Sequence, residues 1–166
     1  MIHGQGLVLA VISIESVGEG RIFHSDGHVY FDVVWSGLVF CPEAGEVLTL
    51  RVQSQSEEGI LLSSEFFEDF YIPKKNMKSG EEEETRWDAA DRRWVYVRHN
   101  HEDPSTDSDE DEDGHEEEFA FENGQEIYAA VFDVQFKSGY DLKSDLTRFS
   151  VCCKIDAPGL GMIASA

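Results

Sequence analysis

The sequence predicts an all-β protein made of two units, a small sheet followed by a closed barrel. Three observations lead to this prediction. Short segments alternate apolar and polar residues at a period of two, which is the pattern of a β-strand. Gly and Pro separate these segments at short intervals, as turns between strands require. In the first unit, no segment has the helical period that would let a helix cover the sheet.

The first unit is expected over residues 1–43. Its four short strands are expected at Leu7–Ile14, Arg21–His24, Val29–Trp35 and Leu38–Phe40. Both alternating faces of the first strand are apolar, as in a covered sheet. Asp26-Gly27 is a strong signal for a two-residue hairpin turn, and Pro42 ends the last strand because proline cannot donate to a ladder. A half-covered sheet is an aggregation liability when alone, so we expect a partner to cover it.

The second unit is expected over residues 44–166. Its strands are expected at Val47–Gln53, Gly59–Ser63, Phe70–Ile72, Arg93–Arg98, Glu126–Phe136 and Phe149–Ile155. Five or six short strands with little helix fit a small closed barrel of the OB-fold type. The polar segment Met77–Arg92 is expected to be a loop with a helical turn at Ala89–Arg92. Most of residues 102–118 are acidic, and this composition predicts a disordered loop at about 100–118, inserted between two barrel strands.

Composition limits the possible functions. The net charge of −21 argues against general binding of nucleic acid, which needs clustered Lys and Arg. However, much of the negative charge lies in residues 81–84 and 102–118, so a locally positive face remains possible. Its candidate residues are Lys74, Lys75, Lys78, Arg86, Arg92, Arg93 and Arg98. Three Cys do not make a disulfide framework and favour a reducing compartment. No apolar run of about 18 residues predicts a membrane span, and the N-terminus lacks the pattern of a signal peptide.

Several blocks of the sequence resemble a known family. In chain order they are LVFCPEAGEVL at 38–48, GI at 59–60 and FEDFYIPKKNM at 67–77. This order resembles the junction between the tip domain and the OB-fold of eukaryotic RNA polymerase stalk subunits. The ending APGLGMI at 157–163 is similar to that of the larger stalk subunit of RNA polymerase III. That family also includes the corresponding archaeal stalk protein and the seventh subunit of RNA polymerase II. RWVYV at 93–97 and GQEI at 124–127 occur where such a subunit would have them.

The resemblance implies a non-catalytic stalk subunit of nuclear RNA polymerase III that needs no cofactor. Its partners would be a smaller helical stalk subunit, the polymerase core and initiation factors. The first unit would be a partial tip domain, because in the family a strand and a helix precede this point and make that domain α+β. The residues expected to dock on the core or partner are Val17, Gly18, Glu19, Gly20, Phe31, Val33 and Trp35.

Aromatic and basic residues interleave in the predicted barrel. OB-folds bind single strands by stacking bases on aromatic side chains while cations follow the backbone. The residues expected to contact RNA on this basis are Phe70, Tyr71, Lys74, Lys75, Trp94, Tyr96 and Arg98. The alternative is that the aromatic residues simply fill the barrel core.

Other chemistry has weaker support. His99, His101 and His115 are metal-ligand types, but they lie beside or in the acidic loop without a rigid scaffold, so we expect no metal site. Thr106 and Ser108 each precede an Asp by three residues, a context that suits an acidophilic kinase. No nucleophile lies in a catalytic motif, so we expect no enzymatic activity.

Two rival interpretations remain open at this point. The first is the equivalent stalk subunit of RNA polymerase I or II, against which the PGLG ending and the acidic insertion argue. The second is a free-standing OB-fold RNA-binding protein, which predicts a first unit that is stable without a partner.

Overall fold

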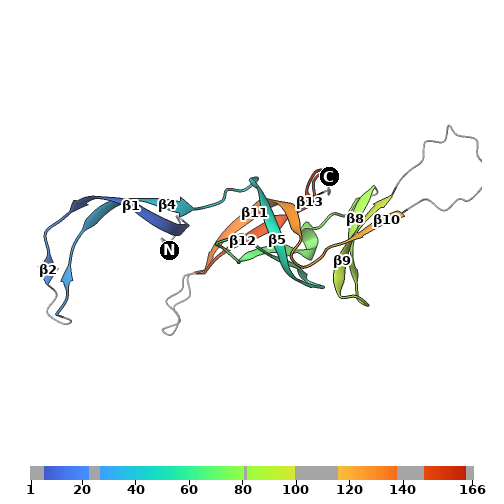
Figure 1. Cartoon of the computed structure of the whole chain (residues 1–166), viewed down its shortest axis with the longest axis horizontal. Coiled ribbons are helices and arrows are strands. Elements are labelled where there is room, and N and C mark those ends of the chain that lie inside the picture. Colours follow the sequence, from blue (N-terminus) through green and yellow to red (C-terminus); the bar gives the residue numbers. More distant parts are fainter. Residues whose placement is uncertain (1–5, 23–26, 81, 100–115, 138–147, 164–166) are drawn as a thin grey trace, which may run out of the picture. The chain divides into compact units, whose positions relative to one another are not determined.

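The computed structural model describes residues 6–22, 27–80, 82–99, 116–137 and 148–163, and these form almost only β-strands (Figure 1). The predicted all-β class is therefore confirmed. The helical element among the described residues is one short 3-10 turn, η1 (Lys74–Asn76). No helix in these ranges is long and apolar enough to cross a membrane. The chain divides into two compact units, residues 1–41 with 136–149 and residues 42–135 with 150–166.

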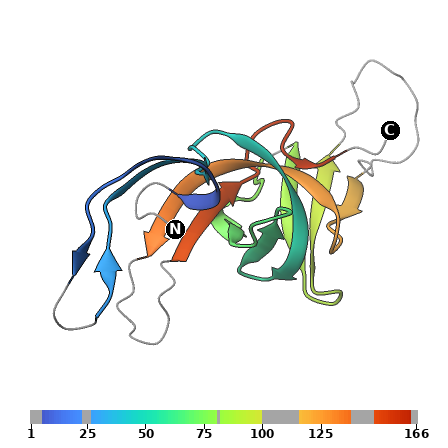
Figure 2. The same ribbon diagram turned by 60° about the vertical axis from the view of Figure 1, so that its left-hand side comes forward.

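Unit 1 is a ribbon of two long antiparallel strands with a short hairpin. Its strands are β1 (Leu7–Val17), β2 (Arg21–Ile22), β3 (Val29–Tyr30) and β4 (Val33–Phe40). β1 pairs with β4, and β2 pairs with β3. Three register shifts interrupt the β1–β4 ladder. Such irregularities bend a strand, and the bend is visible in Figure 2.

The expected strand Val29–Trp35 is divided in the structure. Phe31 and Asp32 lie outside the ladders, and the second part joins the expected Leu38–Phe40 strand to make β4. The backbone amide of Gly18 donates to the carbonyl oxygen of Asp32 at 2.7 Å, so the two breaks face each other. The β1–β4 ladder therefore ends, and the β2–β3 ladder begins, beside the hydrogen bond between Gly18 and Asp32.

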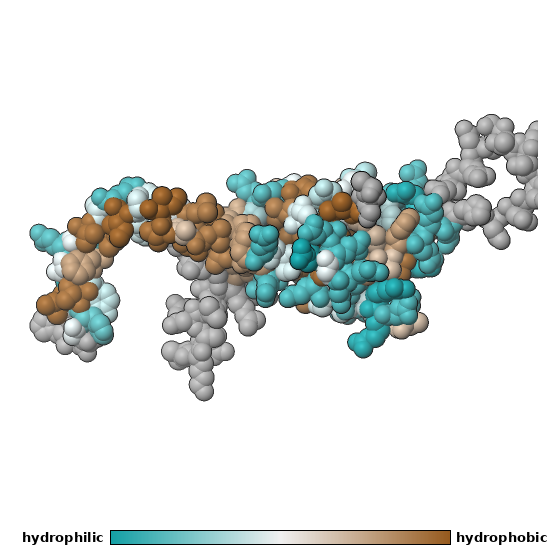
Figure 3. Space-filling model, in the orientation of Figure 1, coloured by the Kyte–Doolittle hydropathy of each residue, from teal (hydrophilic) through white to brown (hydrophobic). Residues whose placement is uncertain are grey.

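Most apolar side chains of unit 1 are exposed. Ile12 is 71% exposed, Ile14 64% and Val34 57%, and the ribbon is largely brown on the face shown in Figure 3. The expectation that both faces of the first strand are covered is wrong for the chain alone, since Leu9 and Val11 are exposed as well. Two strands cannot bury both of their own faces.

Unit 2 contains a closed barrel with the strand order β12-β7-β6-β5-β11, which a β12–β11 pairing closes. The bounds are β5 (Val47–Ser56), β6 (Gly59–Ser63), β7 (Phe70–Pro73), β11 (Glu126–Lys137) and β12 (Arg148–Lys154). β13 (Gly161–Met162) adds to β11. The predicted OB-like barrel is therefore confirmed. Alternate residues of each strand point inward and are at most 2% exposed, among them Leu50, Val52, Ile60, Leu62, Phe70, Ile72, Ile127, Ala129, Val131, Val151 and Cys153.

A separate three-stranded sheet of order β10-β9-β8 completes unit 2. Only β9 (Arg93–His99) was expected. β8 (Glu83–Asp88) lies in the segment predicted to be a loop, and residues 89–92 form the β8–β9 turn instead of a helical turn. β10 (Glu116–Ala120) begins within the stretch predicted to be disordered. The rest of that stretch, residues 100–115, lies outside the described residues.

Cross-strand pairs stabilise this sheet. Trp87 lies opposite Trp94 with ring centroids 5.8 Å apart, and Tyr96 lies opposite Phe119 at 6.3 Å. Arg86 and Glu118 form an ion pair across the sheet. Pairs of this kind contribute roughly 0.2–1 kcal/mol each, and they do not require the alternating apolar pattern by which strands are recognised in a sequence.

Candidate functional site

Two of the residues predicted to contact RNA lie in the core. Phe70 is 0% exposed, and its ring centroid is 5.1 Å from that of Phe67. Trp94 is 1% exposed, and its indole nitrogen donates to the carbonyl oxygen of Ser56 at 2.8 Å. Neither ring presents an exposed face on which a base could stack. The stacking role expected for Phe70 and Trp94 is therefore corrected to packing in the core of unit 2, Phe70 inside the barrel and Trp94 on β9.

The remaining predicted residues form two groups, of which the first lies on β7 and η1. Asn76 is buried, and its side-chain amide donates to the carbonyl oxygen of Cys153 at 3.0 Å, which fixes η1 against β12. Lys74 and Lys75 are exposed beside it. The Tyr71 hydroxyl donates to the carbonyl oxygen of Glu58 at 2.6 Å. Partial burial, reinforced by the charge of Glu58, raises the pKa of Tyr71.

The second group centres on Tyr96 of β9. The Lys78 ammonium lies 5.1 Å from the centroid of the Tyr96 ring, and the Arg98 guanidinium lies 5.9 Å from it. Lys78 is almost completely buried and forms an ion pair with Glu83. Arg98 lies 3.9 Å from Glu83 and 4.0 Å from Glu117.

The electrostatics of this group follow from its hydrogen bonds. Side-chain hydrogen bonds from Lys78 and Tyr96 lower the pKa of Glu83, so this carboxylate is ionised at neutral pH. Partial burial, followed by the hydrogen bond with Glu83, raises the pKa of Tyr96. Hydrogen bonding with Tyr96 raises the pKa of Arg98. The result is two fixed cations and a fixed carboxylate around one aromatic ring.

A hollow of about 500 Å³ lies beside this second group. Tyr96 and Phe119 line it from the sheet, and Lys78, Glu83 and Arg98 line its charged side. The C-terminal segment provides the facing apolar wall with Leu160, Met162 and Ile163. This segment can turn back because Gly159 and Gly161 have φ of +78° and +99°, conformations that favour glycine. Ligand sites typically have about 300–1,000 Å³.

The hollow joins residues from distant parts of the sequence. Tyr71, Lys74 and Lys75 do not line it, so the residues expected to contact RNA are divided between two surfaces. Sequence reasoning did not assign Glu83 or Phe119 to a site, and only the pairing of β9 with β8 and β10 places them beside Tyr96. No cluster of three or more metal-ligating side chains occurs in the part of the chain that the structure describes.

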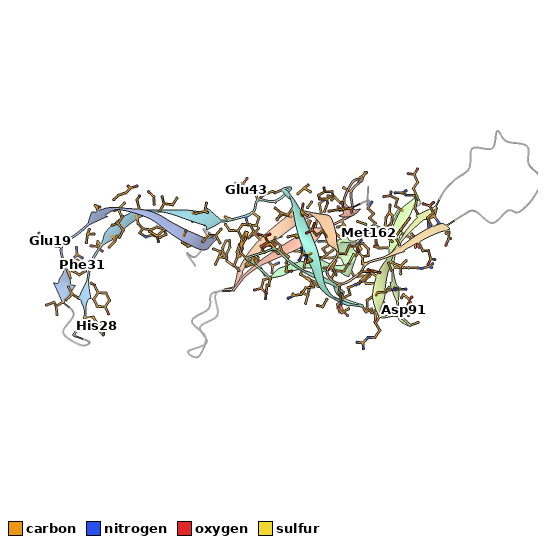
Figure 4. All side chains as sticks on the ribbon, in the orientation of Figure 1. Glu19, His28, Phe31, Glu43, Asp91 and Met162 are labelled. Carbon is orange, nitrogen blue, oxygen red and sulfur yellow. The ribbon has the colours of Figure 1, made fainter. Side chains whose placement is uncertain are left out.

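The residues expected to dock on a partner all lie on unit 1. Val17, Phe31 and Val33 are 42–58% exposed, and Trp35 is half-buried. Glu19 and Phe31 are labelled in Figure 4, where the ribbon passes to the β2–β3 hairpin. A side chain at Gly20 would lie 2.9 Å from the side chains of Phe31 and Val29. Glycine at this position therefore allows Phe31 to lie close to the backbone.

Comparison with known proteins decides the family. Residues 46–149 match the model of the family described as RNA polymerase III subunit Rpc25. The chain belongs to this family. The recognition made from the three sequence blocks is therefore confirmed. The Rpc25 match covers β5 to β11 and ends at Phe149 in β12, so β1 to β4 lie outside it.

Curated relatives carry the same name in three organisms. The DNA-directed RNA polymerase III subunit rpc8 of Schizosaccharomyces pombe is 40% identical over 74 residues, 45% of this chain and 36% of that protein. Subunit RPC8 of Bos taurus is 22% identical over 178 residues, 99% of this chain and 79% of that protein. Subunit RPC8 of Saccharomyces cerevisiae is 31% identical over 91 residues, 52% of this chain and 43% of that protein. The matches thus span less than half the length of both yeast relatives.

Proposed function

We propose that this chain is a non-catalytic stalk subunit that works within the nuclear RNA polymerase III complex. Membership of the Rpc25 family supports this assignment, as do relatives named as subunits of that polymerase. The chain would act by binding, with unit 1 as a docking module and unit 2 as a barrel that meets RNA or initiation factors.

The exposed apolar ribbon of unit 1 is the observation that carries the docking role. Ile12, Ile14 and Val34 are each more than half exposed. Burial of such a side chain against a partner would stabilise a complex by about 1 kcal/mol, because full burial is worth about 1.5–3 kcal/mol. Contiguous apolar surface of this kind marks an interaction site. The proposed occupants are the polymerase core and a smaller helical stalk subunit.

The barrel is the proposed contact for RNA or initiation factors. Tyr71, Lys74 and Lys75 offer an aromatic ring and two exposed cations on neighbouring elements, the combination by which OB-folds hold single strands. Lys74 lies 4.0 Å from Glu57, a loose and exposed pair that a phosphate could replace at little cost. Tyr96 and Arg98 form the second candidate group, in which Arg98 is already paired with carboxylates.

A pull-down of the tagged chain from its own cells tests this proposal. We expect the core subunits of RNA polymerase III to be recovered with a small helical partner. The double variant Ile12→Asp, Val34→Asp should lose both, because it places charge on the ribbon. The matched control Leu61→Asp changes a half-exposed residue of the barrel and should retain them.

Other recoveries would change the assignment. Recovery of RNA polymerase I or II would correct the class of polymerase. Recovery of RNA without any polymerase subunit would refute the stalk proposal and favour a free-standing OB-fold protein.

A further inference from the structure

We propose that the hollow beside β9 binds an apolar or aromatic side chain from a basic segment of a protein partner. We call it the Tyr96–Met162 pocket and define it by Tyr96, Phe119, Leu160, Met162 and Ile163. This inference rests on the proposed binding role of unit 2 and narrows it, because it assigns the surface around Tyr96 to a peptide instead of RNA.

The pocket is large enough to hold a bulky side chain together with neighbouring residues of a peptide. Its volume is about 500 Å³, and aromatic and aliphatic groups face each other across it. The rings of Tyr96 and Phe119 lie side by side on paired strands with an interplanar angle of 36°. Phe119 is 45% exposed, so half of its surface is available to a ligand. Buried aromatic anchors in such pockets provide most of the energy in many interfaces.

The charged side of the pocket is connected by several contacts. Lys78 and Arg98 both approach the Tyr96 ring, and Glu83 bridges the two cations. These contacts hold the Tyr96 ring in place before any ligand arrives. A pre-organised wall lowers the entropy lost on binding.

The charges disfavour an anionic ligand. Lys78 is buried and paired with Glu83, and Arg98 is paired with Glu83 and Glu117. An RNA phosphate would have to displace Glu83 before it could reach buried Lys78, and at Arg98 it would meet the like charges of Glu83 and Glu117. Binding of nucleic acid depends on cations that are free to neutralise phosphates.

The surrounding surface favours a cationic ligand. At the end of the sheet away from the 89–92 turn, the described residues include six carboxylates against three cations. The carboxylates are Glu82, Glu83, Glu84, Glu116, Glu117 and Glu118, and the cations are Lys78, Arg86 and Arg98. A second hollow of about 490 Å³ adjoins Lys78 and is lined by Glu82, Glu83 and Asp156. Complementary charge steers a basic peptide to this end and increases its rate of association.

Fluorescence anisotropy with the full chain tests the proposal. The probe is a labelled Gly-Lys-Arg-Phe-Lys-Arg-Gly peptide, compared with the same peptide carrying Ser in place of Phe and with a polyuridine oligonucleotide. We expect the Phe peptide to bind best at low salt and the Ser peptide to bind roughly tenfold more weakly, the effect of losing a hot-spot side chain. Phe119→Ala should cause a similar loss, and Phe119→Leu should largely restore binding.

Controls separate the pocket from general attraction to an acidic chain. Leu61→Ala truncates a half-exposed barrel residue that does not line the pocket and should leave binding unchanged. Glu117→Lys should weaken peptide binding. Thermal unfolding of every variant verifies that it is folded, and the Phe-to-Ser comparison needs no variant at all. Equal affinity for the Phe and Ser peptides, or no binding of any probe, would overturn the proposal. If polyuridine bound more tightly than the Phe peptide, and Phe119→Ala weakened that binding, the pocket would be assigned to RNA instead.

Discussion

The side chain of Asn76 is expected to be a main determinant of the stability of unit 2. It is 7% exposed, and its amide donates to the carbonyl oxygen of Cys153 at 3.0 Å. Asn76→Ala removes this donor and leaves a buried contact unmade, which costs about 1–3 kcal/mol. The backbone bond from Ile155 to the Asn76 carbonyl oxygen does not depend on the side chain, so η1 should keep its position.

Urea denaturation measures this effect. In a Trp35→Phe background the remaining Trp87 and Trp94 both report on unit 2. With a slope of about 2 kcal/mol per molar urea, a loss of about 2 kcal/mol lowers the midpoint by about 1 M. The neighbouring exposed Lys75→Ala is the matched control and should move the midpoint little. A loss below about 0.5 kcal/mol, within the range of ordinary surface substitutions, would refute the role assigned to Asn76.

Three further predictions concern single residues. The folded-state pKa of Glu83 is lowered from 4.5, so ionised Glu83 stabilises the fold above pH 4.5. This stabilisation is lost as the pH falls through the lower folded-state pKa. In urea denaturation, the stability of Glu83→Gln should therefore fall less with decreasing pH in the acid range than that of the unmodified chain. Burial raises the pKa of the Cys153 thiol to about 12. At pH 8 a thiol reagent should therefore label exposed Cys41 and leave Cys153 unmodified until urea is added. Fast labelling of Cys153 without urea would contradict its packing in the barrel. Gly59→Ala would place a Cβ 2.1 Å from the carbonyl oxygen of Ile72, and its thermal midpoint should fall by far more than that of an exposed Gly-to-Ala change; an unchanged midpoint would rule out the β6–β7 register.

The barrel strands could be predicted from the sequence because burial follows their alternation. In β5, Leu50 and Val52 point inward while Arg51 is exposed. The alternation of apolar and polar residues in the sequence therefore matches the alternation of buried and exposed side chains. β8 and β10 could not be recognised because their residues are largely charged. They are held by backbone pairing with β9 and by contacts such as Tyr96 with Phe119, whose partners are far apart in the sequence.

The candidate site was predictable only in part, for a related reason. Trp94 and Val95 are adjacent and both buried, because the two faces of β9 are both covered there. Alternation therefore could not tell a surface aromatic from a core aromatic in this strand. The sequence identified Tyr96 and Arg98 as candidates. Glu83 and Phe119 lie beside them only through the register of β9 with β8 and β10, which the residues of β9 alone do not predict. The proposed peptide pocket depends on Glu83 and Phe119.

The contrast between the two units predicts how the stability of unit 1 should respond to assembly. None of the residues of β1 to β4 is buried, whereas unit 2 has a continuous core. The amides of β1 and β4 are therefore expected to exchange with solvent quickly in the isolated chain, because local opening costs little where few apolar contacts are lost. A partner that binds only the folded ribbon stabilises it in proportion to the logarithm of its concentration over Kd.

Hydrogen exchange measured by mass spectrometry on the isolated chain and on the purified polymerase complex tests this expectation. Protection of peptides from β1 and β4 should rise strongly in the complex, while peptides from β5 and β11 should change little because they are already protected by the barrel. Slow exchange of β1 and β4 in the isolated chain would mean that the ribbon is stable by itself. The exposed apolar residues of unit 1 would then no longer argue for a partner, and the free-standing interpretation of this chain would regain its main support.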